Sequence, residues 1–144
     1  IEADARDTGK ILAAAAGTLD FGRPVAIMLL GILPFIPDED NPWAITAELE
    51  VAVPVGSYLA VSHWASDIRA EDAAEAGSRY NQHSAVPLRL RPRAEFTRFF
   101  DGFDLTGPGV VPVSHWQPGP LPDGQPKMEA LPAYAAIGRK PAGQ

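Results

Sequence analysis

The chain contains no cysteine among its 144 residues. This absence excludes disulfide bonds, thiolate metal sites and thiol nucleophiles, because all three need a cysteine sulfur. A chain without cysteine is compatible with a reducing compartment, and we expect a cytoplasmic protein.

Positive charge is scarce relative to negative charge. Twelve Lys and Arg residues stand against eighteen Asp and Glu residues, so the formal net charge is −6 at pH 7. An acidic chain repels the phosphate backbone of DNA and RNA, and we therefore expect no nucleic-acid partner. We interpret the one dense basic stretch, Arg89-Leu90-Arg91-Pro92-Arg93, as a solvated loop.

Apolar runs long enough to span a membrane are also missing. The longest, Pro24 to Pro37, is interrupted by proline and falls short of the about 20 residues that a membrane helix needs. We expect no membrane association. The chain begins at Ile1, without Met and without a signal-peptide pattern, and we expect the natural start to lie upstream.

Apolar residues make up 46% of the composition, which is ordinary for one globular domain. Their spacing predicts four helices and four strands, with a proline- and glycine-rich loop at Gln117–Pro126 before the last strand. Helices are expected at Lys10–Ala16, Pro42–Val53, Arg69–Gln82 and Arg93–Phe100. Strands are expected at Pro24–Leu33, Ser57–His63, Val110–Val113 and Tyr134–Arg139.

The order of these elements predicts an α/β fold with a mostly parallel sheet and a terminal antiparallel hairpin. The strand at Pro24–Leu33 is apolar without alternation, which is typical of an interior parallel strand covered on both faces. It is the first strand of the chain, however, and lacks enough neighbours to cover both its edges. Since an open apolar edge promotes pairing with other chains, we expect a preceding N-terminal half or self-association to cover it.

Several short segments, taken in their order and spacing, resemble a known family. They are Glu2–Asp7, Arg23–Asp40, Gly56–Leu59, Ser62-His63, Phe99–Phe103, Pro108–Val111 and Gly138–Pro141. The chain resembles the C-terminal half of an actinobacterial family of S-adenosylmethionine-dependent methyltransferases with the class I, Rossmann-like fold. The resemblance implies that residues 1–144 form a single methyltransferase-like domain with the last four of seven strands. The glycine-rich N-terminal half of that fold is absent, and no GxGxG motif occurs here.

The resemblance also implies S-adenosylmethionine as the methyl donor and a set of residues that would bind it. The Asp4 carboxylate would accept from the exocyclic amine of adenine, while the N–H of Ala5 would donate to a ring nitrogen. Leu30, Gly31 and Ile32 end the first strand, where a small residue allows the cofactor to approach closely. Without the resemblance, Asp4 is also compatible with a loop residue and Leu30 with ordinary core.

The tetrapeptide Val-Ser-His-Trp occurs twice, at Val61–Trp64 and at Val113–Trp116. The flanking residues show no longer repeat, and we interpret the recurrence as coincidence. A shared metal site would need a third ligand, but His83 shows no metal-ligand spacing, so we expect no metal. His63 ends a predicted parallel strand, at the rim where α/β sheets bind ligands, and is therefore the candidate catalytic base.

The sequence leaves two functions open. One is a methyltransferase that acts on a small-molecule or protein acceptor, in which catalysis is mostly alignment of the reacting groups. The other is a non-catalytic α/β module that binds a ligand or a partner through its open sheet edge. The adenine-reading pair Asp4-Ala5 favours the first, and the missing glycine-rich turn favours the second.

Overall fold

One mixed sheet organises the chain, and the computed structural model describes it for residues 2–116 and 128–143. The helices are α1 (Thr8–Ala15), α2 (Pro42–Ala52), α3 (Ala70–His83) and α4 (Arg93–Thr97). The strands are β1 (Ala26–Leu30), β2 (Tyr58–Trp64), β3 (Asp104–Leu105), β4 (Val111–Pro112) and β5 (Ala133–Arg139). Short 3₁₀ turns are η1 (Leu33–Phe35), η2 (Asp38–Asp40), η3 (Arg98–Phe100) and η4 (Val113–His115).

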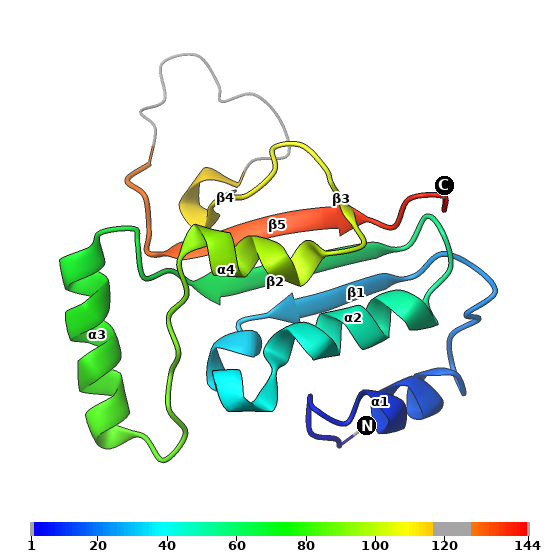
Figure 1. Ribbon diagram of the computed structural model, residues 1–144, viewed down its shortest axis with the longest axis horizontal. Helices are drawn as coiled ribbons and strands as arrows, with labels where there is room; N and C mark the ends of the chain where they lie inside the picture. The colour runs from blue at the N-terminus through cyan, green and yellow to red at the C-terminus, as the bar shows by residue number, and fades with distance from the viewer. Residues whose placement is uncertain (1, 117–127, 144) are drawn as a thin grey trace.

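The strand order is β1-β2-β5-β3, with β4 also paired to β5 (Figure 1). β1 and β2 run parallel, in a register that places Ala26 opposite Tyr58 and Leu30 opposite Ser62. β5 runs antiparallel to β2, β3 and β4. The predicted α/β class and the antiparallel terminal strand are confirmed.

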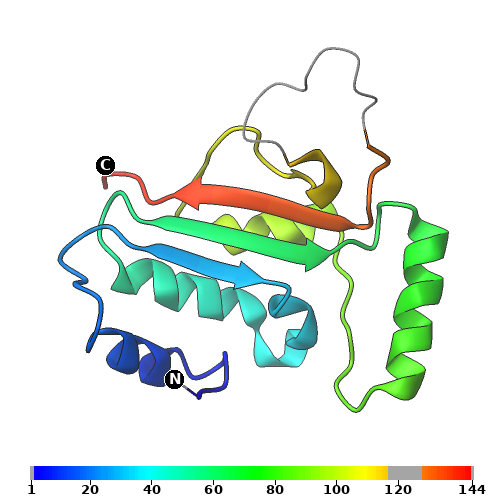
Figure 2. The same ribbon diagram turned by 180° about the vertical axis from the view of Figure 1, so that it is seen from behind.

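Helices α2 and α4 cover one face of this sheet (Figure 1). From behind, Figure 2 shows the opposite face of β1, β2 and β5 with no helix of the described residues over it. The core lies between the covered face and the helices; its members include Leu33, Leu59, Phe96, Phe99, Phe100 and Tyr134. The spacing of Phe96, Phe99 and Phe100 at i, i+3 and i+4 predicts that they share an inward face, and all three are buried.

β1 differs from the expected interior strand. Its side chains alternate, so that Ile27 and Leu29 face α2 while Met28 and Leu30 are 63% and 53% exposed. Among the described residues no α-helix covers that second face (Figure 2), and only β2 pairs with β1. The strand is also shorter than expected because Gly31, with a left-handed φ of 71°, turns the chain into η1.

Two predicted elements near the C-terminus break at specific residues. The helix expected at Arg93–Phe100 tightens into α4 followed by η3. The strand expected at Val110–Val113 is limited to β4, because the chain turns into η4 directly after Pro112. The loop expected at Gln117–Pro126 lies outside the described residues. In the part of the chain that the structure describes, no helix has the length and apolar character needed to cross a membrane.

Candidate functional site

A depression of about 500 Å³ lies beside the carboxyl end of β1 and brings together four of the five predicted cofactor-binding residues, Asp4, Ala5, Gly31 and Ile32. We call it the Asp4 depression. Three segments form its walls, namely 4–6, 31–40 and 85–87. The remaining lining residues are Arg6, Phe35, Ile36, Pro37, Asp40, Ala85, Val86 and Pro87. Ligands of α/β proteins bind outside the carboxyl ends of parallel strands, and this depression has that position.

The rim of the Asp4 depression carries a small ionic network. Arg6 Nη2 lies 2.6 Å from Asp4 Oδ2, Arg6 Nε lies 2.9 Å from Asp4 Oδ1, and Arg6 Nη1 lies 2.6 Å from Asp40 Oδ2. The hydrogen bond from Arg6 lowers the pKa of Asp4 to about 2, so this carboxyl group is ionised at neutral pH. Asp4 is half exposed, and exposed ion pairs rearrange at small cost.

The backbone around Asp4 leaves hydrogen-bonding groups available to a ligand. Asp4 Oδ2 accepts one hydrogen bond from the described residues, from Arg6, whereas a carboxylate oxygen can accept two. The N–H of Ala5 has no acceptor within residues 2–116 and 128–143. An ionised acceptor and a backbone donor therefore belong to adjacent residues. The Watson–Crick edge of adenine has an amine that needs an acceptor and a ring nitrogen that needs a donor, so the two groups are complementary to it.

Gly31 shapes the opposite wall. Its N–H donates to the Ser62 carbonyl at 3.1 Å, and its left-handed φ of 71° is a conformation that L side chains rarely adopt. A methyl group on Gly31 would have no atom within 4 Å, so the space beside it is open. This position thus provides both the turn after β1 and room for a ligand.

Leu30 does not join the other four predicted residues. It lies on the uncovered face of the sheet and lines a separate hollow, together with Met28, Ala60, Val113 and Trp116. The cause is the two-residue period of a strand, which turns neighbouring side chains to opposite faces. The structure therefore does not bring the Leu30 side chain together with Gly31 and Ile32 in the Asp4 depression.

His63 lies in the core instead of facing a substrate, with 2% of its surface exposed. Its Nε2 is 2.8 Å from Arg91 Nη1, and its Nδ1 is 2.8 Å from the Trp64 carbonyl oxygen. Because Arg only donates and a carbonyl only accepts, Nδ1 carries the proton and Nε2 accepts. Burial lowers the pKa of His63 to about 4, which keeps the ring neutral.

This geometry gives no support to His63 as a base, because both ring nitrogens are already paired inside the protein. The position follows from the alternation of β2, which sets His63 on the same face as the buried Leu59 and Val61. That period of two was readable in the sequence. Strand-end position alone did not distinguish the core face from the ligand face.

The other two histidines occupy unrelated places. His115 Nε2 is 2.7 Å from the Met128 carbonyl oxygen, and His83 Nδ1 is 2.9 Å from the Arg79 carbonyl oxygen. The first Val-Ser-His-Trp copy ends a strand, whereas the second forms η4. Within the described residues, no group of three or more His, Cys, Asp or Glu side chains could hold a metal ion.

Arg91 is the feature that the sequence analysis missed. The basic stretch at 89–93 was interpreted as a solvated loop, but Arg91 has an exposed fraction of 0% while Arg89 and Arg93 are exposed. Its partners come from distant segments, among them Leu33, His63 and Asp38. Nothing in the local sequence separates Arg91 from its two arginine neighbours.

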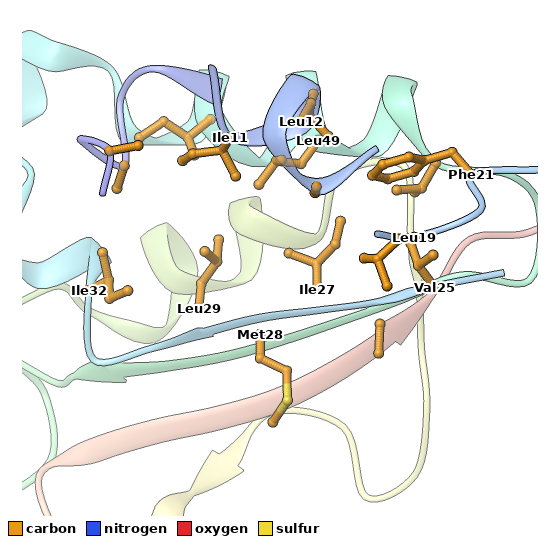
Figure 3. Close-up of a pocket in the computed structure, with 16 residues that line it drawn as sticks. Ile11, Leu12, Leu19, Phe21, Val25, Ile27, Met28, Leu29, Ile32 and Leu49 are labelled. Atoms are coloured by element: carbon orange, nitrogen blue, oxygen red, sulfur yellow. The ribbon is translucent and has the colours of Figure 1, made fainter. Parts of the chain in front are cut away.

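A second hollow, of about 370 Å³, lies between α1, β1 and α2 and is lined almost entirely by apolar side chains. Figure 3 shows Ile27 and Leu29 pointing from β1 into it, with Ile11 and Leu12 above them, whereas Met28 points to the other side of the strand. We call it the β1 cavity. It adjoins the strand whose edge has no partner among the described residues.

Comparison with known proteins matches this chain to methyltransferases. A family model described as S-adenosyl methyltransferase matches residues 1–141. A solved DUF574 family protein from Streptomyces avermitilis is 37% identical over 98% of this chain and 54% of that chain, with a TM-score of 0.86. A candidate methyltransferase from Thermobifida fusca is 31% identical over 99% of this chain and 53% of that chain, with a TM-score of 0.82.

More distant structures share the fold alone. An O-methyltransferase family protein from Burkholderia thailandensis is 14% identical over 100% of this chain and 36% of that chain, with a TM-score of 0.59. The chain spans about half the length of the Streptomyces and Thermobifida proteins. A search of curated protein sequences finds no match.

Proposed function

From the premise that this chain belongs to the S-adenosyl methyltransferase family, we propose that it binds the adenine end of S-adenosylmethionine in the Asp4 depression. One observation carries the proposal. Residues from two segments that are far apart in the sequence, Asp4-Ala5 and Gly31-Ile32, line the same depression beside the carboxyl end of β1.

The chemistry of the depression fits adenine. The ionised Asp4 can accept from the exocyclic amine, and the N–H of Ala5 can donate to the adjacent ring nitrogen. Most of the other lining side chains are apolar, among them Ile32, Phe35 and Val86, and they suit the faces of a planar base. Arg6 would share Asp4 with the ligand or turn toward Asp40, with which it already pairs.

When bound, S-adenosylmethionine supplies a methyl group that is already activated on a sulfonium. The contribution of this chain is then binding and orientation, which is the larger part of catalysis in such a transfer. We name no base, since His63 is paired inside the core. We propose a small-molecule or protein acceptor, because the net charge of −6 disfavours a nucleic acid.

We further propose that residues 1–144 correspond to the C-terminal half of the complete methyltransferase fold. Three features support a polypeptide segment adding to β1. They are the unpaired edge of β1 among the described residues, the exposed Met28 and Leu30, and the apolar β1 cavity beside that edge. The relatives have nearly half of their length outside the matched region, which is sufficient for such a segment.

The open edge also favours a second candidate function, a non-catalytic module that binds a partner chain along β1. The two candidates differ in what the Asp4 depression does. A partner-binding module has no reason to distinguish one purine nucleoside from another.

The test uses the 144-residue chain and compares adenosine with inosine by amide chemical shifts at millimolar ligand. Inosine has a carbonyl in place of the amine and a protonated N1. It would therefore place an acceptor against the Asp4 carboxylate and a donor against the Ala5 N–H. We expect adenosine to shift the amides of Ala5, Gly31 and Ile32, and inosine to leave them unchanged. Equal shifts with both nucleosides, or shifts confined to other residues, would remove the basis for the proposal.

A further inference from the structure

We propose that Arg91 is a positioning residue that holds the Leu33–Asp38 wall of the Asp4 depression in its binding geometry. The inference concerns the order of this wall, and its consequence for ligand binding rests on the proposed function. Arg91 does not line the depression, so any effect must act through the wall.

The guanidinium is bonded to three groups of the wall. Nη1 donates to the Leu33 carbonyl at 3.1 Å, and Nη2 donates to the Ile36 carbonyl at 2.9 Å and to Asp38 Oδ1 at 2.7 Å. The Leu33 carbonyl belongs to η1 and also accepts from the Ile36 N–H at 3.2 Å, whereas the Ile36 carbonyl belongs to the residue that follows the turn. Arg91 thus joins both ends of the wall.

The neighbouring backbone strengthens this connection. The N–H of Arg89 donates to the Pro34 carbonyl at 2.8 Å, and Arg89 Nε lies 3.1 Å from Asp38 Oδ2. The segment 89–91 therefore lies against the wall and bonds to it at four residues, Leu33, Pro34, Ile36 and Asp38.

The far side of the guanidinium is held by the core. His63 Nε2 accepts from Nη1 at 2.8 Å, and the Arg91 Cζ lies 5.3 Å from the Trp43 ring centroid and 5.8 Å from that of Phe99. The neutral His63 is a suitable acceptor, since a charged imidazole would repel Arg91. A buried charge with this many fixed partners has little freedom to move.

The wall in turn controls the depression. Phe35, Ile36 and Pro37 line it, and Asp40, two residues after the wall, pairs with Arg6 on the opposite side of the depression. A displaced Leu33–Asp38 segment would move these side chains relative to Asp4 and Ala5. The distance between the two walls therefore depends on a residue that a ligand does not touch.

The experiment separates wall order from overall stability in the 144-residue chain. Asp38→Asn weakens the bond between Arg91 and the wall, while Arg91 and its contacts with the core remain. Arg91→Lys keeps the positive charge but loses the several N–H donors that the planar guanidinium presents to the wall. The matched control is Lys140→Met. Lys140 donates to the Glu50 and Val53 carbonyls at 2.7 and 3.0 Å, near the end of α2 that lies away from the depression.

We expect Asp38→Asn and Arg91→Lys to raise hydrogen exchange at the amides of 33–40 by about tenfold while β2 and β5 stay protected. Adenosine affinity should fall by about fivefold in both variants. Lys140→Met should lower the melting temperature but leave both the hydrogen exchange at 33–40 and the adenosine affinity unchanged. In the wild type, ¹⁵N shifts of His63 should show a protonated Nδ1 and a bare Nε2.

Unchanged exchange at 33–40 in both variants, or an equal increase in Lys140→Met, would overturn the inference. Failure of the proposed function has a different signature. In that case the wild type would not bind adenosine at millimolar concentration, although Asp38→Asn still loosens the wall.

Discussion

Arg91 Nη1 and His63 Nε2 lie 2.8 Å apart in the core, with the imidazole neutral and the guanidinium charged. The arrangement requires that His63 stay unprotonated, because a proton on Nε2 would remove the acceptor and place two like charges in contact. Burial lowers the pKa of His63 to about 4, from an ordinary value of 6.5. The pair thereby links the stability of the fold to pH.

The first prediction concerns acid stability. As pH falls from 6.5 to 4, the unfolded chain takes up a proton on His63 before the folded chain does, so the free energy of unfolding decreases. The free energy of unfolding should decrease by roughly 3 kcal/mol between pH 6.5 and pH 4. Well above pH 6.5, His63 is neutral in both the folded and the unfolded chain, so its contribution should not change with pH. Urea unfolding at several pH values measures it.

A pair of variants isolates the contribution of His63 from that of the carboxylates. His63→Gln should be less stable at pH 7 but should lose less stability on acidification than the wild type. His115→Gln, which changes a histidine outside the core, should keep the wild-type profile. Parallel profiles for His63→Gln and the wild type would contradict the assignment.

The second prediction concerns Asp4. Asp4→Ala removes the ionised acceptor for the adenine amine, and we expect roughly a tenfold loss of adenosine affinity in an NMR titration. Asp20→Ala is the matched control, because Asp20 accepts from the Gly22 N–H in a turn and does not line the depression. If adenosine affinity is unchanged in Asp4→Ala while the fold is intact, Asp4 is a loop residue and does not bind the ligand.

The third prediction concerns Gly31. Its φ of 71° is left-handed, so Gly31→Ala should lower the free energy of unfolding by roughly 1–2 kcal/mol. Gly17→Ala introduces the same methyl group at a residue with ordinary φ, and its effect should stay within about 0.5 kcal/mol. Chemical denaturation measures both, and equal effects would show that the turn after β1 tolerates a side chain.

The fourth prediction concerns the uncovered face of β1. We expect the 144-residue chain to bind the part of the Streptomyces avermitilis relative that lies outside the matched region, measured by co-purification and light scattering. Leu30→Lys and Met28→Lys should abolish this binding with little effect on the stability of the chain, because both side chains are exposed.

Val51→Lys is the control for this face, since Val51 is 78% exposed on α2, a helix on the opposite, covered face of the sheet (Figure 1). Binding that survives Leu30→Lys, or that is lost equally in Val51→Lys, would contradict an interface on β1. Self-association of the chain, sensitive to Leu30→Lys, would indicate that a second copy covers the same face.

The local sequence determined most of the elements and part of the core. The spacing of apolar residues located α2, α3, β2 and β5 to within a residue or two, and the spacing of Phe96, Phe99 and Phe100 indicated their inward face. These features depend on interactions within one helix or strand, so a short window of residues contains the information. The resemblance to methyltransferases likewise depended on the order of short segments along the chain.

The tertiary structure decided which of these residues meet. Asp4 and Gly31 line one depression while Leu30 turns to the opposite face, and Arg91 is buried because its donors reach Leu33, which lies 58 positions away in the sequence. Burial of a charged side chain depends on the acceptors that the folded chain brings around it. These acceptors come from distant segments, so the residues next to the side chain in the sequence do not indicate them. The sequence placed His63 at a strand end on the same face as Leu59 and Val61, and the packing of that face against Phe99 and Arg91 determined that it is buried.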